Sequence, residues 1–131
     1  HRDLKLQNLM IDERGFIKII DYGIARILSF NELAYSGMGT PEYMSPEMLN
    51  KDGYNFTADW WSVGILMFEL RFGKTPFSNR NQAQLIESIT NGEIIWPNQA
   101  RFPRSEEFDD LINKLLQKDR TLDLRHSKKS L

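Results

Sequence analysis

Four side chains near the start of this 131-residue sequence have types and a spacing that could do chemistry together. Asp3, Lys5 and Asn8 lie in the stretch HRDLKLQN, and Asp21 opens the later stretch DYG. Carboxylate and amide oxygens are the ligands that Mg²⁺ prefers, and a carboxylate outside the metal site could accept a proton. With a lysine adding positive charge, this set suits phosphoryl transfer, in which an enzyme positions the reactants and neutralises charge.

These side chains can meet only if the chain between them folds back on itself. Residues 9–20 read LMIDERGFIKII, a pattern that predicts two short strands around a turn at residues 12–15. Such a hairpin would return Asp21 close to Asn8. Considered alone, these Asp and Asn residues would more often mark a polar turn than a site.

The remaining sequence predicts a loop and then helices. Residues 21–56 are rich in Gly, Pro, Ser and Asn, so we expect mostly loop, with a short helix over residues 47–50. A longer helix is predicted over residues 57–72, with Thr57 as its N-cap and Gly73 as its C-cap. Its apolar character nearly all round indicates burial, with four bulky side chains in the core: Trp60, Trp61, Met67 and Phe68.

Two further helices are predicted over residues 79–91 and 105–117, the second of them capped by Ser105. This second helix presents an apolar inner face made of Phe108, Leu111, Ile112, Leu115 and Leu116. Two strands followed by helices predict an α+β fold that is mostly helical with a short hairpin.

The composition narrows the class of protein. A net charge of −1 argues against a nucleic-acid partner, because such proteins usually carry a basic excess. The sequence has no cysteine, which excludes disulfides and thiolate metal sites and suits a cytoplasmic (intracellular) location. No apolar run reaches the ~18 residues of a membrane span. Because the first residue is His1 rather than Met, we expect a fragment of a longer protein.

The motifs resemble those of one enzyme family. HRDLKLQN, DYG, GTPEYMSPEM and DWWSVGILMFELRFGKTPF follow the order of the motifs of eukaryotic serine/threonine protein kinases. They are most similar to the AGC group, the cyclic-nucleotide-dependent and related kinases, and the resemblance runs from His1 to about Asp119. It implies that residues 1–131 are a partial kinase domain: the C-terminal lobe with its hairpin, the N-terminal lobe missing.

The resemblance implies transfer of the ATP γ-phosphate to a Ser or Thr hydroxyl of protein substrates, with ATP and Mg²⁺ as cofactors. Asp3 would be the catalytic base. Lys5, which would contact the γ-phosphate, matches the serine/threonine-kinase pattern. Asn8 and Asp21 would hold Mg²⁺ and the nucleotide, and Thr40 would bridge Asp3 and Lys5.

Other residues would support this centre. By resemblance, Arg2 pairs with a phosphate on the activation segment, and Ser36, four residues before Thr40, is the candidate phosphosite. Loop serines are common, so Ser36 is also compatible with an ordinary loop residue. Asp59 would anchor the catalytic loop through its backbone amides.

Glu47 would form a buried ion pair with an arginine near the end of the chain. Direct alignment puts Asp123 at that arginine's position, so Arg125 would serve only with a two-residue insertion. Without its partner, a buried Glu47 would cost about 3–5 kcal/mol.

Three residues are candidates for contact with the substrate. Glu42 and Glu69 stand where arginine-directed relatives recognise basic substrates, whereas Tyr43 either docks substrate or simply packs. Gln7 stands where such relatives often have Glu, so one acidic contact is lost. The resemblance therefore implies a weakened preference for basic motifs.

The sequence lacks the glycine-rich loop, the strand lysine and the helix glutamate that a working kinase uses. We therefore expect the chain alone to be inactive and its longer parent to be the kinase. The missing helices would also leave apolar surface uncovered, which favours poor solubility. Two alternatives stay open: a pseudokinase, or a scaffold or interaction module built on the helical lobe.

Overall fold

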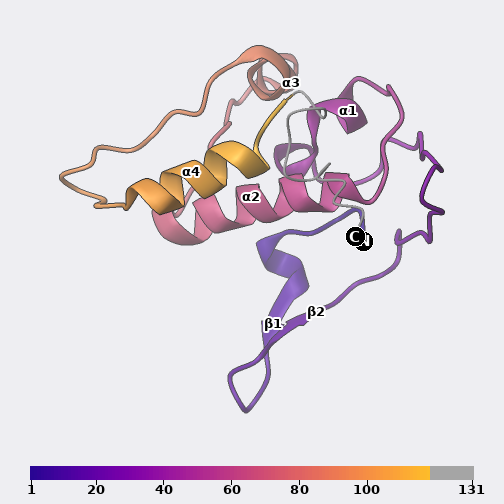
Figure 1. Cartoon of the computed structure of the whole chain (residues 1–131), viewed down its shortest axis with the longest axis horizontal. Helices are drawn as coiled ribbons and strands as arrows, with labels where there is room; N and C mark the ends of the chain where they lie inside the picture. Colours follow the sequence, from indigo (N-terminus) through magenta and orange to yellow (C-terminus); the bar gives the residue numbers. More distant parts are fainter. Residues whose placement is uncertain (119–131) are drawn as a thin grey trace, which may run out of the picture.

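The computed structural model describes residues 1–118, a short hairpin followed by a helical body (Figure 1). This order confirms the predicted α+β class. The strands are β1 (Leu9–Ile11) and β2 (Ile17–Ile19), and the helices are α1 (Pro46–Leu49), α2 (Thr57–Phe72), α3 (Gln82–Asn91) and α4 (Glu106–Leu115). Single 3₁₀ turns cover Leu6–Asn8 and Pro41–Tyr43.

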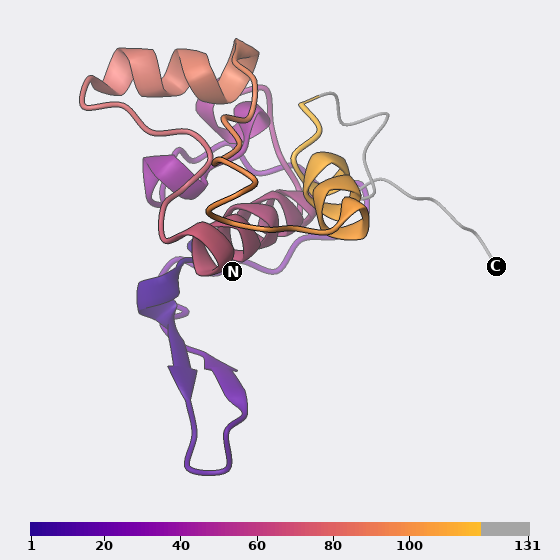
Figure 2. The ribbon, with the colours of Figure 1, turned by 90° about the vertical axis from the view of Figure 1, so that its left-hand side faces the viewer.

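The two strands pair antiparallel, with Leu9 opposite Ile19 and Ile11 opposite Ile17. The Asp12 carboxylate closes the turn by accepting the backbone N–H groups of residues 14 and 16, each at 2.9 Å. Figures 1 and 2 show the hairpin projecting away from the helical body. Leu9 packs partly buried against the core, but the hairpin's apolar side chains from residue 10 onward are accordingly exposed within the described residues, Ile11 to 74% and Ile17 to 64%. The predicted hairpin is confirmed, and its faces are left uncovered.

Helix α2 is the centre of the body, and α4 lies along it (Figure 1). The two helices approach at Gly64, where a Cβ atom would lie 2.8 Å from Leu116 Cδ2 and 2.9 Å from Leu115 Cβ. A larger residue would therefore force the helices apart. The main core surrounds this contact and includes Trp61, Ile65, Phe68, Phe72, Ile89 and Ile112.

The ends of α2 fit the prediction only in part. Gly73 ends the helix as expected, with φ of +75° and its N–H donating to Glu69 O at 2.7 Å. Thr57 is not the N-cap, because Phe56 takes that position. The Asn55 side chain instead accepts hydrogen bonds from the Thr57 N–H, at 3.0 Å, and from the Thr57 hydroxyl.

The prediction of burial is wrong for two side chains. Trp60 is 52% exposed and Leu111 is 37% exposed, because the elements within residues 1–118 cover other faces of α2 and α4.

Helix α3 also starts later than predicted, at Gln82, because the Asn81 side chain caps it by accepting two backbone N–H groups. Ser105 caps α4 as predicted, accepting the Phe108 N–H at 3.1 Å. None of the helices in residues 1–118 has the length and apolar character needed to cross a bilayer.

Lys118, the last described residue, ties the end of α4 to the end of α3. Its Nζ donates to Ser88 O at 3.2 Å and to Ile89 O at 2.5 Å. The same nitrogen lies 4.3 Å from the centre of the Phe77 ring. Burial lowers the pKa of Lys118 from 10.5 to about 8, because desolvation penalises the charged ammonium.

This lowered pKa makes stability depend on pH. Between pH 8 and 10.5 the unfolded chain binds more protons at Lys118 than the folded chain does. The free energy of unfolding should therefore rise with pH across this range. The rise should be larger than in a Lys118→Met variant, which has no titrating group at this position. Chemical denaturation at both ends of the range measures the difference. A difference that stays constant, or one reproduced by Lys74→Met at an exposed position, contradicts the prediction.

Candidate active site

Thr40 contacts two charged side chains of the opening stretch, Asp3 and Lys5. Its hydroxyl donates to Asp3 Oδ1 at 3.0 Å and accepts from Lys5 Nζ at 2.8 Å. Lys5 Nζ also lies 3.4 Å from Asp3 Oδ2. The carboxylate is therefore held by a hydroxyl on one oxygen and a cation beside the other, which fixes its orientation.

Asn8 is 5% exposed and supports Asp3 from the other side. Its Nδ2 donates to Asp3 O at 2.8 Å and lies 3.4 Å from Asp3 Oδ2. Because the nitrogen makes these contacts, the amide oxygen Oδ1 is the atom that Asn8 could offer to a cation.

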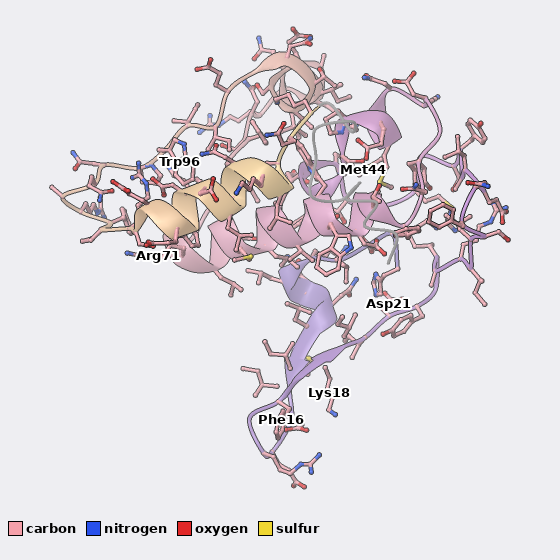
Figure 3. All side chains as sticks on the ribbon, in the orientation of Figure 1. Phe16, Lys18, Asp21, Met44, Arg71 and Trp96 are labelled. Carbon is pink, nitrogen blue, oxygen red and sulfur yellow. The ribbon has the colours of Figure 1, made fainter. Side chains whose placement is uncertain are left out.

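Asp21 follows β2 at the base of the hairpin. The Ile20 N–H donates to Asn8 O at 2.9 Å, so strand pairing brings the residue before Asp21 beside Asn8. Figure 3 shows Asp21 near the helical body, whereas Phe16 lies near the hairpin tip. Asp21 is exposed and has φ of +59°, a left-handed conformation that is uncommon for a non-glycine residue.

His1 links the Asp21 segment to the opening loop. Its Nε2 donates to Ile20 O at 2.9 Å, and its Nδ1 accepts the Asp3 N–H at 3.2 Å. The imidazole also packs edge-on against Tyr22, with ring centres 4.9 Å apart. The aromatic ring at this position therefore keeps a packing role.

The side-chain oxygens of Asn8 and Asp21 fit a magnesium ion that is shared with a phosphate ligand. Mg²⁺ is commonly bound by one or two protein carboxylates together with substrate phosphates and water. Asn8 and Asp21 supply one amide oxygen and one exposed carboxylate for this purpose. Residues 1–118 contain no group of three or more His, Cys, Asp or Glu side chains placed to hold a metal by themselves.

Asp59, in the first turn of α2, holds the opening loop by its backbone. Its Oδ1 accepts the Arg2 N–H at 2.9 Å, and its Oδ2 lies 2.8 Å from the α-amino nitrogen of His1. Arg2 has φ of +74°, which is costly for a non-glycine residue and persists only where the surroundings enforce it. Asp59 provides that enforcement from α2, the helix that carries much of the buried core.

The Arg2 guanidinium gathers the loop that follows Asp21. Its Nε donates to Ile24 O at 2.6 Å, and its Nη1 donates to Ser36 Oγ at 2.8 Å. The arginine and the serine that sequence reasoning paired are thus in direct contact.

Tyr43 is buried and its hydroxyl donates to the Glu69 carboxylate. Burial, together with this bond, raises the pKa of Tyr43 well above its ordinary value. Ser62, which sequence reasoning passed over, donates to Tyr43 O at 2.8 Å and ties this segment to α2. The signal for it was a serine within the apolar run WWSVGILMF.

The other support residues are placed as follows. Glu42 is partly exposed beside Tyr43. Glu47 is buried, at 5% exposure, in α1. Arg125, its expected partner, and Asp123 lie outside the described residues.

Comparison with known proteins gives consistent matches. A family model described as protein kinase domain matches residues 1–128. The chain is 41% identical over 123 residues to a Caenorhabditis briggsae protein named cAMP-dependent protein kinase, catalytic subunit-like, covering 92% of this chain and 30% of that protein.

Two other relatives are similarly close. The human RAC-beta serine/threonine-protein kinase is 41% identical over 122 residues, covering 91% of this chain and 24% of the relative. A Drosophila melanogaster putative protein kinase C delta type homolog is 40% identical over 124 residues, covering 92% and 18% respectively. The chain therefore spans less than a third of the length of each of these relatives.

Proposed function

Because this chain belongs to the protein kinase domain family, with AGC-type serine/threonine kinases as its relatives, we propose that it is the catalytic C-terminal lobe of an active kinase. The kinase would be a longer protein that transfers the ATP γ-phosphate to a Ser or Thr hydroxyl of protein substrates. The observation that carries this proposal is the contact of Thr40 with both Asp3 and Lys5.

The three side chains divide the work of phosphoryl transfer. The Asp3 carboxylate would accept a hydrogen bond from the substrate hydroxyl, orient its oxygen and take its proton. The Lys5 ammonium would face the transferred phosphoryl group and neutralise its charge. Thr40 would hold both groups at a fixed separation, which matters because positioning accounts for most of the catalysis in this reaction.

Asn8 and Asp21 would hold Mg²⁺ together with the ATP phosphates. When bound, Mg²⁺ supplies positive charge that orients the phosphates and stabilises the charge developing on them. Use of ATP also fits a site of action inside the cell.

The substrate-docking side would favour basic substrates only weakly. Glu42 lies in the 3₁₀ turn and is partly exposed, but the Glu69 carboxylate already accepts the Tyr43 hydroxyl. Gln7 contributes no charge. A basic side chain of the substrate would therefore compete with Tyr43 for Glu69.

The chain alone should show no measurable transfer of phosphate from ATP. The groups that grip the α- and β-phosphates in kinases belong to segments outside this sequence, so only part of the nucleotide would be bound. Incubation of the purified chain with γ-labelled ATP and a Ser/Thr peptide mixture checks this. Transfer that Asp3→Asn abolishes would show that the chain is itself a complete catalyst.

The full-length protein carrying this chain is the sample that tests the proposed function. We expect transfer of labelled phosphate to Ser or Thr, and not to Tyr, of protein substrates in the presence of Mg²⁺ and ATP. Nucleotide binding without transfer to any substrate, including a random Ser/Thr peptide library, would favour the pseudokinase reading and overturn the proposal.

A further inference from the structure

We propose that Tyr54 is a positioning residue for the activation segment. Its backbone and its hydroxyl hold Ser36 against Arg2, so that a phosphate placed on Ser36 meets the guanidinium without rearrangement of the loop. The inference rests on the proposed function, because it takes Ser36 as the phosphosite of a kinase.

Tyr54 binds the segment at two points. Through the backbone, Ala34 N–H donates to Tyr54 O at 2.7 Å and Tyr54 N–H donates to Ala34 O at 2.9 Å. Through the side chain, the Tyr54 hydroxyl donates to Ser36 O at 2.7 Å. Tyr54 is 1% exposed and Ala34 is fully buried, so the backbone pair is shielded from water, whereas Ser36 lies at the surface. The residues on both sides of Tyr35 are therefore fixed by one buried side chain and its peptide groups.

The same hydroxyl reaches the arginine. Arg2 Nη1 donates to Ser36 Oγ at 2.8 Å and to Tyr54 Oη at 3.3 Å, and Ser36 Oγ lies 3.4 Å from Tyr54 Oη. The Tyr54 hydroxyl donates its one proton to Ser36 O, so its oxygen accepts the hydrogen bond from Arg2. Arg2, Ser36 and Tyr54 thus close a triangle in which each group orients the other two.

Gly53 shows how tightly the segment is seated. It has φ of +81°, and a Cβ atom there would lie 2.8 Å from Tyr35 Cε1 and 3.0 Å from Leu33 Cδ1. A residue with a side chain at this position would be strained in its backbone, and the outer atoms of Tyr35 and Leu33 would have to move. The neighbouring side chains of Tyr35 and Met38 are 62% and 46% exposed, so they fix the segment little. The hydrogen bonds of Tyr54 to Ala34 and Ser36 therefore contribute much of its attachment to the body.

This arrangement prepares the site for a dianionic phosphate. Phosphorylation adds about −1.5 to −2 charge, and a guanidinium binds phosphate best when its planar fork is already oriented. Arg26, also in this segment, is paired with Glu32 at 2.6 Å, which leaves Arg2 as the cation in contact with Ser36. By fixing both partners beforehand, Tyr54 lowers the ordering cost of the new ion pair.

The test is the second pKa of phosphoserine at position 36, read by ³¹P NMR in the full-length protein with phosphoserine incorporated at that position. An ordinary phosphoserine titrates at about 6, and a guanidinium in contact should lower this by about one unit. Tyr54→Phe should lose at least half of that lowering, because the phosphate is then less firmly held beside Arg2. Gly53→Ala, which keeps the hydroxyl but strains the backbone beside Tyr54, should act in the same direction.

Tyr43→Phe is the matched control, since it removes the hydroxyl of another buried tyrosine, whose partner is Glu69 rather than Ser36, and should leave the phosphate pKa unchanged. Equal lowering in the native chain and in both Tyr54→Phe and Gly53→Ala would overturn the inference, as would an ordinary pKa in the native chain. The measurement needs neither ATP nor catalysis. Failure of the full-length protein to transfer phosphate would therefore count against the proposed function and not against this one.

Discussion

Replacing Asp3 by Asn in the full-length protein should lower the rate constant for phosphate transfer by about 10²–10⁴-fold. The side-chain shape is retained, and the amide oxygen could still accept the Thr40 hydroxyl, which lies 3.0 Å from Asp3 Oδ1 in the native chain. An amide, however, cannot take the proton of the substrate hydroxyl, and it no longer offers a charge to Lys5. The loss should therefore fall on kcat.

Steady-state kinetics with a Ser/Thr peptide at saturating ATP measure this loss, and the affinity for ATP should change little. Asp110→Asn is the matched control, because Asp110 makes an exposed ion pair with Lys114 at 2.7 Å on α4. That variant should retain full activity. If Asp3→Asn also stayed fully active, Asp3 would not be the base and the proposed mechanism would have to be abandoned.

The hairpin and the central helix were predictable because their signals are local. Two short apolar runs around a Gly-containing turn specify β1 and β2, and Gly73 marks the end of α2 through its left-handed φ of +75°. The start of α3 was predicted three residues early because Asn79 and Asn81 are both good cap residues. Only the structure shows which of them accepts the N–H groups of the first turn.

Exposure was the harder quantity to predict. Trp60 and Leu70 lie on an apolar helix, yet they are 52% and 65% exposed. The sequence of one helix reports how apolar each face is, and not which face the rest of the chain covers.

The candidate site depended on contacts between distant residues, which periodicity does not contain. The role of Thr40 beside Asp3 came from family resemblance, and the structure places the two side chains in contact across 37 positions of sequence. Tyr54 and Ser62 were passed over because a buried hydroxyl in a loop or an apolar helix has no distinctive spacing. Their functions become visible only through their partners, Ser36 and Tyr43.

Removing the Asp59 carboxylate should impair catalysis from outside the reacting atoms. In the native chain it accepts the Arg2 N–H at 2.9 Å and contacts the α-amino nitrogen of His1 at 2.8 Å. Hydrogen bonds to a charged acceptor are worth about 1.5–3 kcal/mol, so Asp59→Ala should release Arg2 from its left-handed φ of +74°. Because Asp3 follows Arg2 directly, its carboxylate would move, and a displacement of this kind can cost about 10²-fold in rate.

Phosphate-transfer kinetics of full-length Asp59→Ala, with hydrogen exchange of the Arg2 amide, measure this effect. In Asp59→Ala the Arg2 amide should exchange faster and the rate of phosphate transfer should fall. Asp59→Asn keeps one acceptor oxygen for Arg2, so it should lose less of the amide protection and less of the transfer rate. A variant that lost activity with the Arg2 amide still protected would show that Asp59 acts by some other route. Since α2 carries both Asp59 and the buried core, the catalytic loop takes its position from the most deeply packed helix, which is why a substitution there should reach Asp3.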